Sequence, residues 1–508
     1  MSFSIDTRIS DLDAMEAEGV DLMVVGGGIT GAGIARDAAM RGLSVGLVER
    51  GDFASGTSSR SSKLIHGGLR YLEQGEINLV LEANRERKCL TEIAPHLALH
   101  ARLAFPVHGR TSAGLMKLRA GLWAFEKMAK VPADDRHEVW DRDESVARIP
   151  GLLDERLQGA AVYSEYITDD ARLTLETLKS AKRHGARVVN RAPAVALREI
   201  EPSLTVSAKS RSRSAGLCVG LRDDLSGRSL EVNAGVVVNA AGPWVDSVRR
   251  LGGATNDRMQ LTKGIHLVVA RDRLPVDDIV VMRGQDGRIL FVVPFEDICW
   301  IGTTDTFYPR AVERPEITRE DVDYLLEATN RTWPGQPIDP AEVRGAWAGV
   351  RPMLRQEGKN PSEISRKDEI LIEPSGLLSI AGGKLTTYRQ MAERVVDAAV
   401  KRLGGVSQDC TTGQESLVEG EDPISMVRTH LSDEEIDFAI EQESASSVAD
   451  ILERRARANF FAADNGLGAL ENVAGALSRR MGWTDEQTDQ EIRLYQSRIR
   501  EDLAWREE

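Results

Sequence analysis

The sequence contains few cysteines, four in 508 residues. They are Cys89, Cys218, Cys299 and Cys410, and no two of them are close in sequence. This spacing excludes a disulfide framework of the secreted type and a clustered cysteine site, and we expect no metal. Acidic residues precede the first apolar run, which argues against a signal peptide, so we expect a cytoplasmic protein.

Two further absences narrow the class of protein. No uncharged apolar run reaches the roughly 18 residues of a membrane-spanning helix, which leaves at most attachment to a membrane surface. Basic residues are not in excess, because 65 Lys and Arg stand against 79 Asp and Glu, a net charge of −14. We therefore expect no nucleic-acid partner, since such proteins usually carry a basic excess.

Lysine is absent from residues 411–508. These residues contain 22 acidic and 10 basic side chains, a net charge of −12, so the rest of the chain carries only −2. A composition shift of this size predicts a separate C-terminal domain. It also leaves the preceding part of the chain able to focus positive charge on a local pocket.

The first motif with a chemical meaning is a glycine turn between a strand and a helix. An apolar strand is expected at 21–25, the turn G-G-G-I-T-G follows at 26–31, and a helix is expected from 29 to 41. A second strand at 44–48 ends at Glu49. Strand, turn, helix, strand and acid in this order are typical of a dinucleotide-binding unit.

Each residue of the motif has a physical task. Gly26 permits the tight turn, Gly28 lets a pyrophosphate approach the backbone, and Gly31 lets helix and strand pack closely. The helix N-terminus attracts the pyrophosphate. Glu49 suits the ribose hydroxyls and repels a 2′-phosphate, so the motif favours FAD or NAD over NADP.

Six longer blocks extend the signal along the chain. They read TSSRSSKLIHGGLRYL from residue 57, VVVNAAGPWV from 236, LTKGIHLVV from 261, WIGTTDT from 300, AGVRPML from 348 and AGGKLTTYR from 381. With the glycine turn, they closely resemble the FAD-dependent, quinone-linked glycerol-3-phosphate dehydrogenase family over about residues 20 to 400. The resemblance implies FAD as the cofactor and oxidation of sn-glycerol 3-phosphate to dihydroxyacetone phosphate.

The resemblance also implies a fold of the α/β class with three domains. A Rossmann-like FAD-binding domain is split by a substrate domain with a mixed or antiparallel sheet, and an α-helical cap domain closes the chain. The expected ranges are 20–90, 155–245 and 345–404 for the FAD-binding domain, 91–154 and 246–344 for the substrate domain, and 405–508 for the cap. A β-hairpin at 288–303, with its turn at Glu296–Asp297, supports the sheet in the substrate domain.

Short hydroxyl side chains, small residues and a second helix end form the expected cofactor site. The helix that runs to Val396, capped by Thr386 or Thr387, is expected to direct its positive end at the flavin ring. The cofactor contacts that we expect are Gly26, Gly28, Gly31, Glu49, Ser58, Ser59, Ser62, Ala241, Gly242, Gly383, Lys384, Leu385 and Thr386.

The substrate phosphate calls for forked, permanently charged donors, which favours arginine. The resemblance places Arg70, Arg351 and Arg366 at the substrate, and Tyr71 beside them. The C2 hydrogen is expected to leave as hydride to flavin N5 while a base takes the hydroxyl proton. His66 and His266 are both candidates for that base, and Lys384 is a candidate for electrostatic support.

The electron acceptor follows from the resemblance, which implies a membrane quinone. One alternative is an oxidase that passes electrons to oxygen and releases hydrogen peroxide, although related oxidases usually carry an extra insertion. Another alternative is a flavin-binding sensor or subunit without turnover.

Residues 113–130 form a candidate for contact with a membrane. Leu115, Leu118, Leu122 and Phe125 recur at helical spacing among basic residues, a pattern typical of an interfacial helix and equally of a helix packed on its own core. We therefore expect a cytoplasmic protein that can lie peripherally on the cytoplasmic face of the membrane. A homodimer is also compatible with the sequence.

Overall fold

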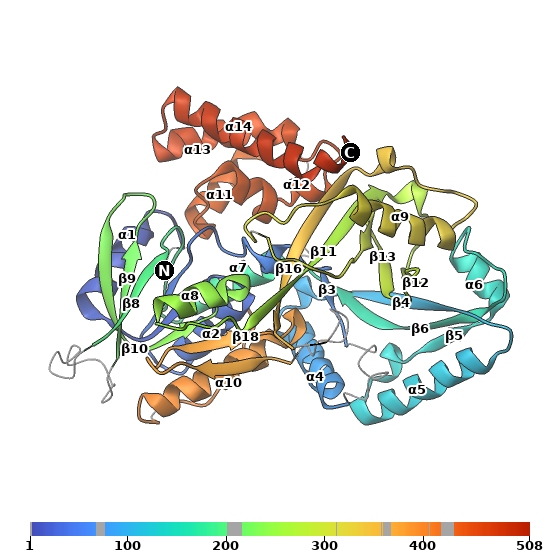
Figure 1. Ribbon diagram of the computed structural model, residues 1–508, viewed down its shortest axis with the longest axis horizontal. Coiled ribbons are helices and arrows are strands. Elements are labelled where there is room, and N and C mark those ends of the chain that lie inside the picture. Colours follow the sequence, from blue (N-terminus) through green and yellow to red (C-terminus); the bar gives the residue numbers. More distant parts are fainter. Residues whose placement is uncertain are drawn as a thin grey trace.

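The computed structural model describes residues 3–67, 77–200, 216–310, 312–356, 358, 367–405, 407–417 and 431–507. Two sheets and a group of C-terminal helices make up this part of the chain (Figure 1). The expected class, an α/β fold with a helical C-terminal region, is confirmed.

The first sheet has the order β17-β18-β10-β1-β2-β7, with β9 paired to β10 and β8 paired to β9. Its strands are β1 (Val20–Val25), β2 (Val45–Val48), β7 (Arg187–Val189), β8 (Ala194–Glu199), β9 (Leu217–Arg222), β10 (Ser229–Asn239), β17 (Glu369–Ile372) and β18 (Leu378–Ala381). The strands from β18 to β7 run parallel, which directs their carboxyl ends to one edge of the sheet. Every residue of β1 is buried, as expected for the centre of a parallel sheet covered on both faces.

Helices cover both faces of this sheet. One face packs against α2 (Ile29–Met40), α7 (Asp170–Arg183) and α10 (Tyr388–Arg402), and the other against α1 (Thr7–Glu18) and α8 (Val245–Leu251). Alanine and glycine are frequent in α2, so this helix sits close to both the sheet and its neighbouring helices.

The second sheet has the order β15-β11-β14-β13-β12-β4-β6-β3, with β16 paired to β11 and β5 paired to β6. Its strands are β3 (Leu64–Ile65), β4 (Leu99–His108), β5 (Glu138–Trp140), β6 (Leu157–Ile167), β11 (Met259–Ala270), β12 (Ile279–Arg283), β13 (Ile289–Phe295), β14 (Ile298–Gly302), β15 (Thr306–Phe307) and β16 (Gly345–Leu354). The predicted hairpin is present as β13 and β14. Only β4 and β12 pair in parallel among these described strands, so the sheet is mixed.

Strands β6 and β16 belong to this second sheet although both fall within the ranges we expected for the FAD-binding domain. The physical reason is pairing, since β6 forms a long antiparallel ladder with β4, and β16 forms another with β11. Helices α5 (Ala113–Ala129), α6 (Arg142–Arg148) and α9 (Arg319–Thr332) pack on this sheet, and α4 (Ile77–Ile93) contacts both α5 and the helices of the first sheet.

The C-terminal region consists of α11 (Asp433–Glu443), a π-helix (Asp450–Arg455), α12 (Ala458–Phe461), α13 (Leu470–Met481) and α14 (Asp485–Asp502). These helices share an apolar core of their own. Figure 1 shows them above the two sheets, with α12 next to β16. Among the described residues, no helix is both long and apolar enough to span a membrane.

Candidate active site

A cavity of about 460 Å³ lies where the two sheets meet. The turns that follow β1, β2, β10 and β18 line it from the first sheet, and residues of β11 and β16 line it from the second. Ligands of parallel α/β sheets bind at this carboxyl edge, and the volume lies in the range of roughly 300–1,000 Å³ that is usual for ligand sites.

The turn after β1 requires glycine at two positions. Gly26 has a φ of +117°, and a Cβ at this residue would lie 2.6 Å from the carbonyl oxygen of Ala240. A Cβ at Gly31 would lie 1.9 Å from the carbonyl oxygen of Gly26, so only glycine lets α2 pack on the turn. Gly28 lines the cavity directly before α2, whose first N–H groups and positive dipole end suit a phosphate.

Glu49 follows β2 and also lines the cavity. Its carboxylate accepts hydrogen bonds from the N–H groups of Gly27 (2.6 Å) and Gly51 (2.8 Å). Burial raises the pKa of Glu49, and the two N–H donors oppose this rise by stabilising the charged form. A carboxylate offers about four acceptor positions, so Glu49 can still receive hydrogen bonds from ribose hydroxyls.

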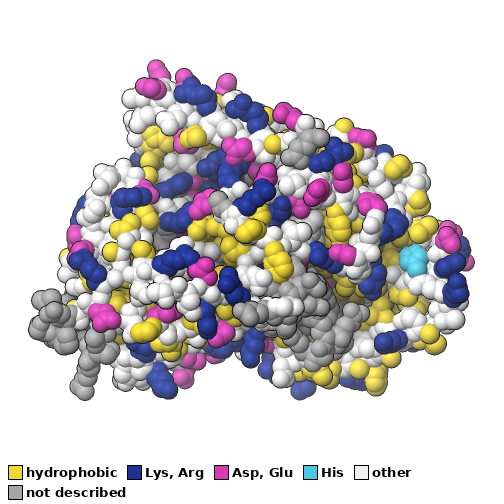
Figure 2. Space-filling model, in the orientation of Figure 1, with side chains coloured by type: hydrophobic (Ala, Val, Ile, Leu, Met, Phe, Trp, Pro, Cys, Tyr) yellow, Lys and Arg dark blue, Asp and Glu magenta, His cyan; other side chains and the backbone are white. Residues whose placement is uncertain are grey.

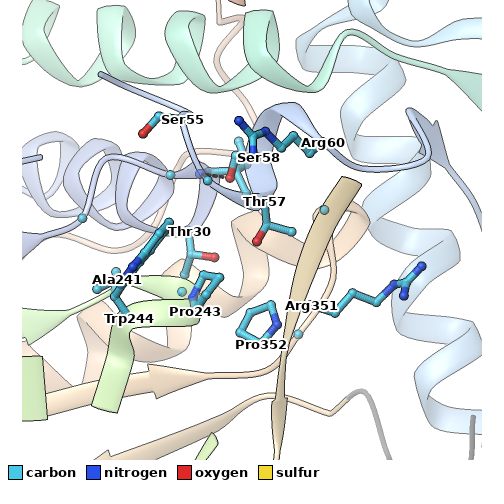
Figure 3. A pocket seen from close by; sticks show the side chains of 18 of the residues that line it. Thr30, Ser55, Thr57, Ser58, Arg60, Ala241, Pro243, Trp244, Arg351 and Pro352 are labelled. Carbon is cyan, nitrogen blue, oxygen red and sulfur yellow. Dashed lines mark hydrogen bonds between the residues drawn. The ribbon is translucent and has the colours of Figure 1, made fainter. Parts of the chain in front are cut away.

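Residues 57–63, which we call the serine loop, form one wall of the cavity (Figure 3). The Ser58 hydroxyl accepts the N–H of Ile29 (3.0 Å) at the start of α2. Ser62 hydrogen-bonds with Nε2 of His266 (2.9 Å). Ser59, also expected at the cofactor, is buried behind the wall, where its hydroxyl donates to the carbonyl oxygen of Gly56 (3.5 Å).

His266, on β11, lines the cavity and is only 2% exposed. Its ring stacks on Trp347 of β16, with 4.6 Å between ring centroids and 13° between ring planes. Nδ1 of His266 makes no hydrogen bond within the described part of the chain. Burial, followed by the positive charges of Arg351 and Lys63, holds the pKa of His266 well below its ordinary 6.5. The ring is therefore neutral at physiological pH.

Arg351, on β16, lies at the opposite end of the view from Trp244 (Figure 3). Its guanidinium pairs with Asp305 (3.1 Å) and donates to the hydroxyl of Thr303 (3.0 Å) and the carbonyl oxygen of Thr304 (3.2 Å). These contacts hold a permanent positive charge in one orientation at the cavity wall.

The segment before α10 brings Gly383, Lys384, Leu385 and Thr386 to the cavity. Thr387 occupies the N-cap position of α10, as predicted, but its side chain accepts no N–H of this helix. The Thr386 hydroxyl instead donates to the carbonyl oxygen of His66 (3.5 Å), and a short 3-10 turn at Leu385–Thr387 leads into the helix.

The remaining predicted residues divide into two groups. His66, Ala241 and Gly242 line the cavity. Arg70, Tyr71 and Arg366 lie outside the described residues.

Sequence reasoning missed a buried ionic group that joins the last residue of the serine loop to two residues behind it. Lys63, Asp170 and Arg457 form a buried ionic group, in which Asp170 pairs with Lys63 (3.0 Å) and with Arg457 (2.9 Å). Lys63 stood within the block at 57–72, but no local pattern marks the other two residues. Asp170 and Arg457 are 287 residues apart.

FAD fits the arrangement. The turn at Gly26 and the N-terminus of α2 are suited to its pyrophosphate, and Glu49 is suited to its ribose. His266 and Arg351 line the part of the cavity that the second sheet forms, beside the residues suited to the cofactor. Fold and site together define a flavoprotein with a dinucleotide domain and a second-sheet domain.

Comparison with known proteins identifies the family. The family model described as FAD dependent oxidoreductase matches residues 21–389, and the model described as the C-terminal domain of alpha-glycerophosphate oxidase matches residues 414–488. The chain belongs to the FAD-dependent oxidoreductase family, and FAD is its cofactor.

Within this family, the chain is similar to aerobic glycerol-3-phosphate dehydrogenases. It is 42% identical to that of Staphylococcus haemolyticus (strain JCSC1435) over 391 residues, which is 77% of this chain and 68% of the relative. It is 43% identical to that of Staphylococcus aureus (strain MRSA252) over 385 residues, 75% of this chain and 67% of the relative. The family resemblance predicted from the sequence is confirmed.

Solved structures agree. The glycerol-3-phosphate dehydrogenase from Bacillus halodurans complexed with FAD is 30% identical, with a TM-score of 0.80 over 99% of this chain and 98% of that chain. Glycine oxidase from Geobacillus kaustophilus is 20% identical, with a TM-score of 0.56 over 79% of this chain and 99% of that chain, and shows the fold alone.

Proposed function

We propose that this enzyme oxidises the C2 hydroxyl of sn-glycerol 3-phosphate to give dihydroxyacetone phosphate. The observation that carries the proposal is a neutral, buried His266 near a fixed Arg351 on one cavity that also contains a dinucleotide turn. The names of the relatives support the choice of substrate.

Arg351 binds the substrate phosphate in this proposal. A guanidinium keeps its charge at any physiological pH and can hold two phosphate oxygens at once. Asp305, which is 6% exposed, fixes the orientation of the guanidinium. Arg70, Tyr71 and Arg366 remain predicted substrate residues on the strength of the family resemblance.

His266 accepts the hydroxyl proton. Its low pKa keeps the ring unprotonated, and the bond between Nε2 and Ser62 orients it. Trp347 fixes the plane of the ring by stacking. His66, which also lines the cavity, is the second candidate for this base.

FAD, when bound, supplies the acceptor for the hydride that leaves C2. Gly28 and Ser58 hold the pyrophosphate at the N-terminus of α2, and Glu49 holds the ribose. Lys384, on the cavity before α10, adds positive charge where the reduced ring becomes negative. The other predicted contacts on the cavity, Ala241, Gly242, Gly383, Leu385 and Thr386, provide close backbone approach.

Electrons pass to a membrane quinone in this proposal, and the surface of α5 supports it. Figure 2 shows hydrophobic and basic side chains along the lower right edge, where α5 lies in Figure 1. Met116, Trp123 and Met128 are 61%, 59% and 45% exposed, and Lys117 and Lys127 are exposed on the same helix. Such a mixture is typical of a helix that lies in an anionic membrane interface.

Our prediction of which side of α5 meets the membrane is wrong. Leu122 and Phe125 are buried against the protein, and Leu118 is half-buried. Phe125 packs with Val80 of α4 and with Val131. The predicted stripe thus forms the inner face of the helix, and the residues named above form the outer face.

An anaerobic experiment tests the proposed function. Adding sn-glycerol 3-phosphate to the oxidised holoenzyme should bleach the flavin absorbance, whereas glycerol, which lacks the phosphate that Arg351 binds, should not at the same concentration. A quinone should then restore the colour faster than dissolved oxygen does. Absence of bleaching would contradict both the dehydrogenase and the oxidase and favour a non-catalytic flavin protein, and faster return with oxygen would favour the oxidase.

A further inference from the structure

The serine loop is fixed from several directions. The Thr57 hydroxyl donates to the carbonyl oxygen of Val350 (2.6 Å), which belongs to the second sheet. Asp170, at the start of α7, accepts from the N–H (2.9 Å) and hydroxyl (2.6 Å) of Ser61. The position of Ser62, and with it the orientation of His266, depends on these contacts.

The C-terminal helical region supplies a further contact through Arg457. This side chain is 1% exposed and lies between the π-helix and α12. Its Nη2 donates to Oδ1 of Asp170 (2.9 Å) and to the carbonyl oxygen of Ser59 (3.3 Å), and its Nη1 lies 3.3 Å from Asp169. Arg457 has a φ of +62°, an uncommon backbone conformation for a bulky residue, which is kept when the surrounding contacts demand it.

Lys63 shares the acceptors of Arg457. Its Nζ donates to the same Ser59 carbonyl (3.0 Å) and the same Asp170 oxygen (3.0 Å). Burial, followed by the charge of Arg457, lowers the pKa of Lys63 to about 8, and Lys63 and Arg457 in turn lower the pKa of Asp170. Two cations from distant parts of the chain therefore clamp one carboxylate and one carbonyl behind the serine loop.

A second route from the same region reaches His266 by apolar contact. Phe460 and Phe461, in α12, lie 5.3 Å and 5.8 Å from Trp347 between ring centroids. Trp347 in turn stacks on His266 and donates from Nε1 to the carbonyl oxygen of Ser61 (3.2 Å). Residues 457–461 thus contact both the support of the serine loop and the support of the histidine ring.

We propose that the C-terminal helical region is a working part of the active site, in which Arg457 and Phe460 are positioning residues. Arg457 holds the serine loop against the cofactor cavity, and Phe460 holds Trp347 against His266. The inference rests on the proposed function only where it assigns a task to His266, because the effect of the serine loop on FAD affinity does not involve the substrate.

Replacement of Arg457 in the full-length holoenzyme tests the first route. Arg457→Gln leaves Asp170 and the Ser59 carbonyl with Lys63 alone, so the dissociation constant of FAD should rise at least about tenfold. Arg457→Lys restores the charge and should recover part of the affinity. Arg498→Gln is the matched control, because Arg498 pairs with Glu453 of the same π-helix (3.1 Å) and makes no ion pair or hydrogen bond with the serine loop in the described part of the chain.

Replacement of Phe460 tests the second route. Phe460→Leu should lower the rate of flavin reduction at saturating sn-glycerol 3-phosphate at least about tenfold, with a much smaller change in the half-saturating concentration. Phe438→Leu is the control, because Phe438, in α11, is 47% exposed and lies on Lys179.

The outcomes of these experiments distinguish failure of the first route, failure of the second route and failure of the proposed function. A folded Arg457→Gln enzyme with wild-type FAD affinity, or a loss equalled by Arg498→Gln, would overturn the first route. A Phe460→Leu enzyme that is reduced at the wild-type rate would overturn the second, even where Arg457→Gln failed to fold. A wild-type enzyme that sn-glycerol 3-phosphate does not reduce would contradict the proposed function and leave the FAD affinities to decide the first route.

Discussion

Glu165, in β6, is a buried acid beside Gly67. Its two oxygens lie 3.1 Å and 3.2 Å from the N–H of Gly67, and the nearer guanidinium nitrogen of Arg87 is 3.4 Å away. Burial raises the pKa of Glu165 from its ordinary 4.5 to about 7, because these partners offset only part of the cost of burying charge.

This shift predicts a dependence of stability on pH. The folded state favours protonated Glu165, so its contribution is fully present below about pH 4.5 and is lost as pH rises through about 7. The loss is on the order of 3 kcal/mol. Glu165→Gln should remove this slope and raise the Tm relative to wild type more at pH 8 than at pH 5. Exposed Glu155→Gln is the control, and an equal difference at both pH values would contradict the prediction.

Residues inside a compact motif could be predicted from the sequence, because spacing along the chain defines their neighbours. Gly26, Gly28 and Glu49 are of this kind. Arg457 could not be predicted, because its partners lie far away in sequence. The sequence alone does not distinguish a buried arginine from an exposed one. Its role depends on tertiary contacts that no local pattern encodes.

At the scale of elements, α5 shows what a helical pattern leaves open. The spacing of its leucines predicted a helix but could not decide whether protein or membrane covers them. The structure places that stripe inward, and the outer face carries Met116, Trp123 and Met128. Strands β6 and β16 show the same limit of sequence patterns. Alternation of polar and apolar residues predicts a strand, but it does not predict which strand it pairs with.

Membrane binding by α5 yields a prediction at this scale. Each exposed apolar side chain contributes about 1–2 kcal/mol when it enters the interface, so replacing Met116, Trp123 and Met128 by Ser should reduce binding to anionic phosphatidylglycerol vesicles at least about tenfold. Sedimentation with vesicles at low and high salt measures this binding. Leu494→Ser, at an exposed residue of α14, is the control. Unchanged binding of the triple variant to the vesicles would exclude this face.

At the scale of the whole molecule, the net charge of the C-terminal region differs in sign from the side chains that attach it to the rest of the chain. The acidic C-terminal region carries most of the net charge of −14, yet it directs Arg454, Arg455 and Arg457 inward, where Asp52 and Asp170 receive them. Within the described residues, most acids of this region are exposed, whereas Glu443, Asp450 and Glu453 are buried and pair with Arg454 and Arg455. The charge shift in the sequence predicted the domain but gave no sign of this attachment.

In the proposed mechanism, His266 takes the hydroxyl proton of sn-glycerol 3-phosphate and the bound cofactor takes its C2 hydrogen. The most direct test is the rate at which flavin absorbance is lost under anaerobic conditions with substrate deuterated at C2, compared with ordinary substrate. We expect a several-fold slower loss with the deuterated substrate, and a low rate for both substrates in His266→Asn. Equal rates for the two substrates in an enzyme limited by chemistry, or a His266→Asn variant as fast as wild type, would contradict it.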